Sequence, residues 1–378
     1  MTTVLTTRAL NRALLARQHL LERAAMPPLS MVEHLVALQA QNPHDPYLAL
    51  WSRVDAFAAA DISDALADAR LVRIGLLRTT LHLVTAEDAR SLWPVVRPVF
   101  ARAWSHSPFR KDLPGIAVDE ILDAARPMLD ETLTLTELGR RLEARWPGRS
   151  PASLSYAARF LLPIVQVPPR GLWGRSGQAR WRRLDSWTGK EGGERPDATT
   201  VGDLVLRYLA AFGPATPADI ATWSWLTGYR EVLESLRPRL RTFRDEAGRE
   251  LFDVPDAPIP RPDTPAPFRF LPEYDNVALS HADRSRIIAP EAGGRITGYV
   301  GTFLVDGFVA GQWRIDRVGD AATLVLDPFT PMSTEQRDEA VAEGESLLAF
   351  REPEATRREV EFGVARATRS GKPAASPP

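Results

Sequence analysis

The chain has 378 residues and a formal net charge of −1, with 44% hydrophobic and 25% charged residues, which is the composition of a globular protein with more than one folded unit. It contains no cysteine, so disulfides, zinc–thiolate sites, iron–sulfur clusters and a thiol nucleophile are excluded. The six histidines lack a ligand-like spacing, and charges or prolines interrupt every apolar run. We therefore expect neither a metal site nor a membrane-spanning helix.

The first predicted unit, residues 1–96, reads as helices followed by a hairpin, which is the order of a winged helix. Ser30 and Glu33 have the spacing of a capping box at the start of the second helix. Gln39 and Gln41 close this helix, and Pro43 ends it. The helices are expected at 7–23, 30–41 and 61–69, and the strands at 71–77 and 80–85.

The same order recurs in two further units, residues 97–188 and 198–256. Thr134 and Glu137 form a second capping-box pattern, and Pro151 suits the first turn of a helix. The expected elements are helices at 119–129, from 134, from 150, at 201–211, from 216 and at 229–240, a wing at 164–184, and a strand at 251–254. The residues from Arg97 to Arg183 carry a basic excess, which is compatible with nucleic-acid binding on one face.

Alternating apolar residues in 266–330 predict a small antiparallel sheet or barrel, with the Asp306-Gly307 pair as a hairpin turn. Its strands are expected at 296–299, 302–305, 308–313 and 322–326. In 331–366 a helix is expected over 334–350, capped by Ser333 and Gln336. Residues 367–378 are expected to form a disordered tail. The predicted fold class is α+β, with three tandem winged-helix units and a small antiparallel β-barrel.

Three stretches together resemble one family of proteins. They are Leu-Gln-Ala-Gln-Asn-Pro at 38–43, Leu-Arg-Thr-Thr-Leu-His-Leu-Val at 77–84, and Phe-Leu-Pro-Glu-Tyr-Asp-Asn-Val-Ala-Leu-Ser-His-Ala-Asp-Arg at 270–284. In this combination the chain resembles the AlkZ-type DNA glycosylases of the winged helix DNA-binding domain-containing family. The resemblance implies a C-shaped molecule with catalytic Gln39 and Gln41 and no cofactor. The implied substrate is double-stranded DNA with alkylated purines or interstrand crosslinks, often in cells that make DNA-alkylating natural products.

Two amides are sufficient for such chemistry because a purine alkylated at N7 or N3 is cationic and already a good leaving group. The enzyme then has to hold a water molecule and stabilise developing charge. A glutamine offers a carbonyl acceptor and two amide donors for these tasks. Side chains two residues apart point in different directions on a regular helix, so we expect the helix to end or distort at 39–42.

Further residues are assigned to DNA contact from their positions in the hairpins. The hairpin-bend residues Arg78, Thr79 and Thr80 are placed to touch phosphate. The interpretations of His82 stay open between a catalytic or DNA-contacting residue and a satisfied, half-buried structural histidine. The second wing adds five arginines without a nearby acid in sequence, namely Arg170, Arg175, Arg180, Arg182 and Arg183. The Asp306-Gly307 hairpin is either a simple tight turn or a probe of the lesion.

The polar segment between Glu273 and Arg284 is interpreted as a buried network that joins the barrel to the first unit, with Asp275 as a helper carboxylate being the minority alternative. The expected function is that of a monofunctional DNA glycosylase, acting as a monomer in the bacterial cytoplasm at the nucleoid. The alternatives are a non-enzymatic winged-helix DNA-binding protein, such as a transcription regulator, and an adaptor that uses winged helices for protein contacts.

Overall fold

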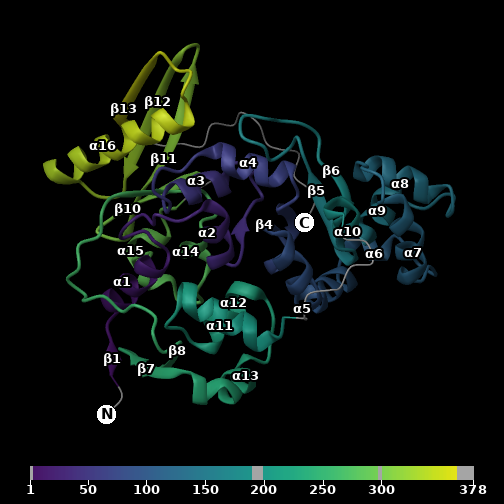
Figure 1. The fold of residues 1–378 in the computed structure, drawn as a ribbon, viewed down its shortest axis with the longest axis horizontal. Coiled ribbons are helices and arrows are strands. Elements are labelled where there is room, and N and C mark those ends of the chain that lie inside the picture. The colour runs from purple at the N-terminus through teal and green to yellow at the C-terminus, as the bar shows by residue number, and fades with distance from the viewer. Residues whose placement is uncertain (1–2, 190–198, 297–299, 364–378) are drawn as a thin grey trace.

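The computed structural model describes residues 3–189, 199–296 and 300–363, which form helices and three mixed or antiparallel sheets. The helices of the N-terminal part of the chain are α1 (Thr7–Arg17), α2 (Pro28–His34), α3 (Asp45–Trp51) and α4 (Ala59–Ala67), and its strands are β1 (Val4–Leu5), β2 (Leu38–Gln39), β3 (Leu71–Gly75) and β4 (Leu81–Thr85). In this part, α2, α3 and β4 lie near the middle of the molecule, whereas β1 lies at its lower edge (Figure 1).

The start of the chain differs from its sequence pattern in two places. Helix α1 ends six residues earlier than expected because His19 takes a left-handed backbone conformation with φ of 53°. Helix α2 begins at Pro28, and no side chain caps its N-terminus, so the Ser30–Glu33 capping box was wrong. A proline in the first turn starts a helix without a cap because its missing N–H needs no partner.

The expected helix through Gln39 and Gln41 was also wrong. Helix α2 ends at His34, and Val36 has φ of 67°, which breaks the helical path. The chain then enters β2, where Leu38 lies opposite Leu83 and Gln39 opposite His82. The outer edge of β4 would otherwise expose unpaired backbone groups, and this short strand covers it.

The two hairpins predicted as separate wings belong to one sheet. The hairpin β3–β4 is connected by the short turn η1 (Leu77–Thr79), and the second hairpin consists of β5 (Ile164–Val167) and β6 (Arg180–Arg183). The five-stranded order is β2-β4-β3-β5-β6, because Arg73 pairs with Gln166 and Ile74 with Val165. The first and second units are therefore joined through their backbones.

Helices around the second hairpin follow the sequence pattern closely. The capping box of Thr134 and Glu137 is formed, and the Ser150 side chain caps the helix that starts at Pro151. The expected helix at 119–129 is present as well. The helices of this part, on the right in Figure 1, are α5 (Ala86–Ser105), α6 (Pro108–Lys111), α7 (Val118–Met128), α8 (Leu135–Glu143), α9 (Pro151–Leu161) and α10 (Leu184–Thr188).

The third part, at the bottom of Figure 1, is tied to the N-terminus by a parallel pairing of β1 with β7, in which Val4 lies opposite Arg244. Its second helix starts at Pro217 after the expected cap Thr216, and Thr216 and Asp219 form a capping box that was not predicted. The elements are α11 (Val201–Phe212), α12 (Pro217–Ser224), α13 (Tyr229–Leu236), η2 (Arg237–Arg239), β7 (Arg241–Asp245) and β8 (Glu250–Asp253).

The C-terminal strands form an open five-stranded sheet of order β13-β12-β11-β10-β9. The expected barrel was wrong, because β9 and β13 lie at opposite edges of this sheet and β13 pairs with β12 in parallel. The expected strand at 296–299 and the tail at 367–378 extend outside the described residues. The elements are β9 (Arg269–Leu271), α14 (Asn276–Leu279), η3 (Arg284–Arg286), α15 (Pro290–Gly293), β10 (Gly301–Val305), β11 (Phe308–Val318), β12 (Ala321–Pro328), α16 (Thr334–Arg351) and β13 (Arg357–Phe362).

Helix α16 carries the predicted capping box of Ser333 and Gln336 and packs on this sheet at the upper left of Figure 1. None of the helices in the described ranges is both long and apolar enough to span a bilayer.

Candidate active site

The Gln39-Ala40-Gln41 segment runs from the end of β2 into a bend at Gln41, and this decides where its side chains lie. The amide of Ala40 donates to the carbonyl oxygen of Leu81 at 2.8 Å, which continues the pairing of β2 with β4. Alternate residues of an extended chain point to opposite faces. Ala40 faces an apolar cluster and is fully buried, whereas Gln41 is exposed. The side chain of Gln39 therefore faces away from this cluster. Gln41 lies in the bend directly after the strand, so neither glutamine belongs to a helix.

Gln39 is held by an arginine from the neighbouring hairpin. Its side chain is only 8% exposed, and its Oε1 accepts a hydrogen bond from Nη2 of Arg78 at 3.0 Å. The Nη1 of the same guanidinium donates to the carbonyl oxygen of Trp223, at the end of α12, at 2.5 Å. Burial lowers the pKa of Arg78 to about 10, with a smaller contribution from the positive charge of Arg284, so Arg78 remains charged at neutral pH.

The bend between β3 and β4 has an unusual backbone. Arg78 and Thr79 both lie in the left-handed region, with φ of 52° and 58°. Side chains with a Cβ avoid this region, and strained backbone of this kind is concentrated at functional sites. Thr80 follows in an extended conformation, and its hydroxyl donates to the carbonyl oxygen of Leu77. Because Arg78 points inward to Gln39 and Trp223, its assignment to a phosphate contact is not supported by its geometry.

His82 lies inside the sheet, between Ile74 of β3 and Gln39 of β2. It is fully buried, so the half-buried interpretation underestimated its burial and a direct DNA contact has no exposed atom to use. Its Nδ1 donates to the carbonyl oxygen of Thr80 at 2.9 Å. Its Nε2 has no hydrogen-bond partner within the described ranges. Burial, followed by the positive charge of Arg78, lowers the pKa of His82 from 6.5 to about 3.

Acidification is expected to destabilise the protein through His82. The folded state keeps this ring neutral down to a pKa of about 3, while the unfolded chain takes up a proton below about pH 6.5. Its contribution to stability is thus present above pH 6.5 and is lost as the pH falls, by roughly 1.4 kcal/mol per pH unit. Urea unfolding at pH 7, 6 and 5 should show a smaller acid loss for His82→Asn than for the wild type. An acid loss for His82→Asn equal to that of the wild type would contradict this prediction.

A buried polar network supports the strand that carries the glutamines. Arg53 and Asp275 form a two-fold hydrogen-bonded ion pair with N–O distances of 2.9 and 2.7 Å, and both side chains are almost fully buried. The next residue, Asn276, donates through Nδ2 to the carbonyl oxygen of Ala37 at 2.7 Å. The interpretation as a network joining the C-terminal part to the first unit is confirmed for Asp275 and Asn276, whereas His281 and Asp283 contact Phe212 and Arg249 of the third part. Asp275 is occupied by Arg53, which disfavours a role as helper carboxylate.

The interaction between two acidic residues, Asp45 and Glu273, was not identified from the sequence. Asp45, at the start of α3, is buried, and burial followed by the carboxyl of Glu273 raises its pKa to about 8. Burial also raises the pKa of Glu273. In the described part of the chain, Asp45 Oδ2, Glu273 Oε1 and His44 Nε2 have no hydrogen-bond partner. The signal available in the sequence was the polar pair His44-Asp45 immediately after Pro43. Asp45 is protonated at neutral pH and able to donate a hydrogen bond.

The arginines of the second hairpin are less free than the sequence indicated. Acids distant in sequence reach them: Asp130 pairs with Arg183 at 2.5 Å, and Glu137 lies 3.7 Å from Arg180. The Nη1 of Arg170 donates to the carbonyl oxygen of Gly177. Arg180 and Arg182 alternate with the buried Trp181 and share the other face of β6. The inference from the linear sequence that no acid lies near these arginines was therefore wrong for this hairpin.

The Asp306-Gly307 turn connects β10 and β11, as its sequence predicts, with φ of 47° and 81°. It packs against α1, however. Asp306 pairs with Arg8 at 2.7 Å and also with Arg12, and Gly307 accepts a hydrogen bond from Asn11. These contacts favour the simple structural turn. The turn that follows, between β11 and β12, was missed, and its Val318 is 78% exposed.

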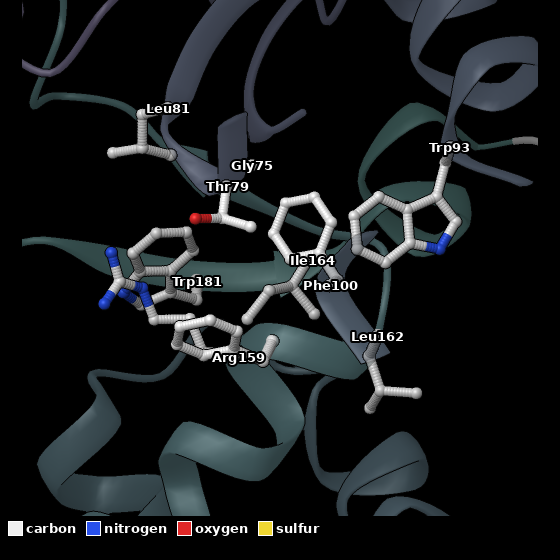
Figure 2. A pocket seen from close by; sticks show the side chains of 10 residues that line it. Gly75, Thr79, Leu81, Trp93, Phe100, Arg159, Leu162, Ile164 and Trp181 are labelled. Carbon is white, nitrogen blue, oxygen red and sulfur yellow. The ribbon is translucent and has the colours of Figure 1, made fainter. Parts of the chain in front are cut away.

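A shallow aromatic pocket lies beside the bend, and Thr79 forms part of its lining (Figure 2). Trp93 and Phe100 of α5 pack together with ring centroids 4.9 Å apart, and the Arg159 guanidinium lies 5.6 Å from the Trp181 ring. The free interior of this pocket is about 30 Å³, which holds a water molecule but not a purine base. Among the residues that the structure describes, no group of three or more His, Asp or Glu side chains is arranged to hold a metal ion.

The chain is similar to known proteins in its sequence and in its fold. A family model described as "DNA glycosylase AlkZ-like" matches residues 32–350. Among solved structures, the DNA glycosylase AlkZ of Streptomyces sahachiroi superposes with a TM-score of 0.72 at 22% sequence identity, covering 96% of this chain and 100% of that chain. A search of curated proteins gave no match. At this identity the structural likeness concerns the fold, and the family model carries the relationship in sequence.

Proposed function

Because the chain belongs to the AlkZ-like DNA glycosylase family, we propose that it hydrolyses the N-glycosidic bond of purines alkylated at N7 or N3. The observation that supports the proposal is the Gln39-Ala40-Gln41 segment, in which Gln39 belongs to β2 and contacts Arg78 while Gln41 is exposed in the bend directly after the strand. A cationic alkylpurine leaves readily, so two amides that hold water and a sugar–phosphate oxygen are sufficient.

The reaction is proposed to be monofunctional, with water as the nucleophile. Lysine occurs only at positions 111, 190 and 372, and an amine nucleophile would be needed to form a covalent intermediate with the sugar. Lys111 lies in α6, in a part of the sequence that does not contain the motif. The expected products are the free alkylated base and an intact strand with an abasic site.

We further propose that the substrates include interstrand crosslinks and that the protein protects a cell that makes a DNA-alkylating natural product. A crosslinked base is attached to both strands and is difficult to extrude completely. An open site suits such a substrate, and Gln41 is exposed while the neighbouring pocket is too small for a purine. The protein is proposed to act as a monomer on double-stranded DNA of the bacterial nucleoid.

The deciding experiment uses duplex DNA with a single N7-alkylguanine. Incubation with the protein and then with hot alkali should give strand breaks at the lesion, well above those of a sample without protein. Breaks that appear without alkali would indicate a lyase, and no breaks above the control would contradict the proposal. A duplex crosslinked by a nitrogen mustard, analysed on a denaturing gel, tests unhooking separately, because persistence of the crosslink would contradict that part alone.

The second hairpin is proposed to contact phosphates through Arg180 and Arg182. Replacement of Arg182 by alanine should weaken binding to all duplexes alike and reduce the slope of log K against log salt by about 0.9 if one phosphate contact is lost. Arg183→Ala is the matched control because Arg183 lies on the same strand but is paired with Asp130. Fluorescence anisotropy across a salt series measures the slope. An equal slope for Arg182→Ala and the wild type would count against this contact.

A further inference from the structure

Arg78 contacts a candidate catalytic side chain, which gives it a role that differs from DNA binding. Its guanidinium makes two inward hydrogen bonds, to Gln39 Oε1 at 3.0 Å and to the Trp223 carbonyl oxygen at 2.5 Å. These two partners lie on different parts of the chain, since Gln39 belongs to β2 and Trp223 to α12. Arg78 therefore fixes the catalytic strand relative to the third helical part.

The chemistry of the guanidinium determines the orientation of the Gln39 amide. Arginine has only hydrogen-bond donors, whereas a glutamine side chain has a carbonyl acceptor at one end and an NH₂ donor at the other. The carbonyl must therefore face Arg78, and a bond to a charged donor is stronger than one between neutral groups. The opposite orientation would place two donors against each other. Gln39 is left with its Nε2 amide as the group available to a ligand.

We propose that Arg78 is a positioning residue that holds Gln39 as a hydrogen-bond donor toward the sugar–phosphate backbone of the damaged strand. This inference rests on the proposed function, in which Gln39 takes part in excision. In this arrangement Gln39 binds an oxygen of the DNA and does not accept the proton of the attacking water. The left-handed conformation of Arg78, with φ of 52°, belongs to the bend from which its side chain reaches Gln39.

The first test replaces the Gln39 amide by an acceptor of the same shape. Gln39→Glu retains two oxygen acceptors for Arg78 but has no donor to present to the DNA. Single-turnover excision of an N7-alkylguanine should be reduced in Gln39→Glu as strongly as in Gln39→Ala. Excision by Gln39→Glu at more than half the wild-type rate would overturn the inference. If Gln39→Ala itself excises at the wild-type rate, the proposed site fails as well, so the two failures are distinguishable.

The second test separates positioning from phosphate binding. Arg78→Met should slow excision at saturating protein by about tenfold to a hundredfold, the range found when residues that orient metal ligands are removed, while the Kd for duplex DNA stays within about twofold, since no phosphate contact is lost. Arg78→Lys retains the charge and one donor, so its excision rate should lie between those of the wild type and Arg78→Met. This variant keeps the test valid if Arg78→Met does not fold. Arg284→Met removes the neighbouring exposed charge and should leave the saturating rate unchanged. A weaker Kd with an unchanged saturating rate for Arg78→Met would identify a phosphate contact and overturn the inference.

Discussion

Replacing either Gln39 or Gln41 by alanine is expected to reduce excision of an N7-alkylguanine by about 100-fold or more, as removal of one oriented donor does at other transition states. Gln41 is exposed, so Gln41→Ala should leave the fold intact. Gln39→Ala also removes a hydrogen-bond partner of Arg78. Duplex binding should remain close to that of the wild type for both variants, because two amides contribute little to the salt-dependent phosphate attraction.

Single-turnover assays at saturating protein measure this effect without interference from product release. Gln336→Ala is the matched control, since Gln336 carries the same amide but caps α16. Circular dichroism spectra of all variants establish that loss of activity does not come from unfolding. Wild-type excision rates in both single variants would show that the motif does not carry the reaction.

The second large effect is expected at the buried pair of Arg53 and Asp275, whose side chains are 0% and 1% exposed. Asp275→Ala leaves the Arg53 charge buried without its counter-ion, which costs about 3–5 kcal/mol of unfolding free energy. The double variant Arg53→Met/Asp275→Leu should recover much of this loss, because no isolated charge is then buried. Urea unfolding curves compared at constant m-value give the differences.

The exposed pair of Arg261 and Asp263, 84% and 69% exposed, provides the control. Asp263→Ala should give no measurable change, because exposed ion pairs contribute little to stability. A loss below about 1 kcal/mol for Asp275→Ala would indicate that water or a local rearrangement replaces the buried pair. Because Asn276 holds the chain just before β2, reduced excision is expected wherever the Asp275 variant remains folded.

In the candidate site, the residue types could be predicted from the sequence, but their conformation could not. The types and positions of Gln39 and Gln41 were available from the chain, and the resemblance to the family is supported by the model that matches residues 32–350. The strand conformation was not available, because β2 exists through its pairing with β4, more than forty residues later. The direction of Arg78 and the acids that reach the second hairpin likewise depend on residues distant in sequence.

Features that arise between residues close in the chain could be predicted from the sequence. The capping boxes at Thr134 and Ser333 are formed as expected because each joins a side chain to a backbone group three residues away. The tertiary structure decided how sheet edges are covered: β2 pairs with β4, β5 joins the first hairpin, and the expected barrel is an open sheet. Pairing of distant strands satisfies backbone groups that no local pattern accounts for. That pairing places Gln39 next to His82 in the sheet, and Arg78 reaches Gln39 from the bend of the same hairpin.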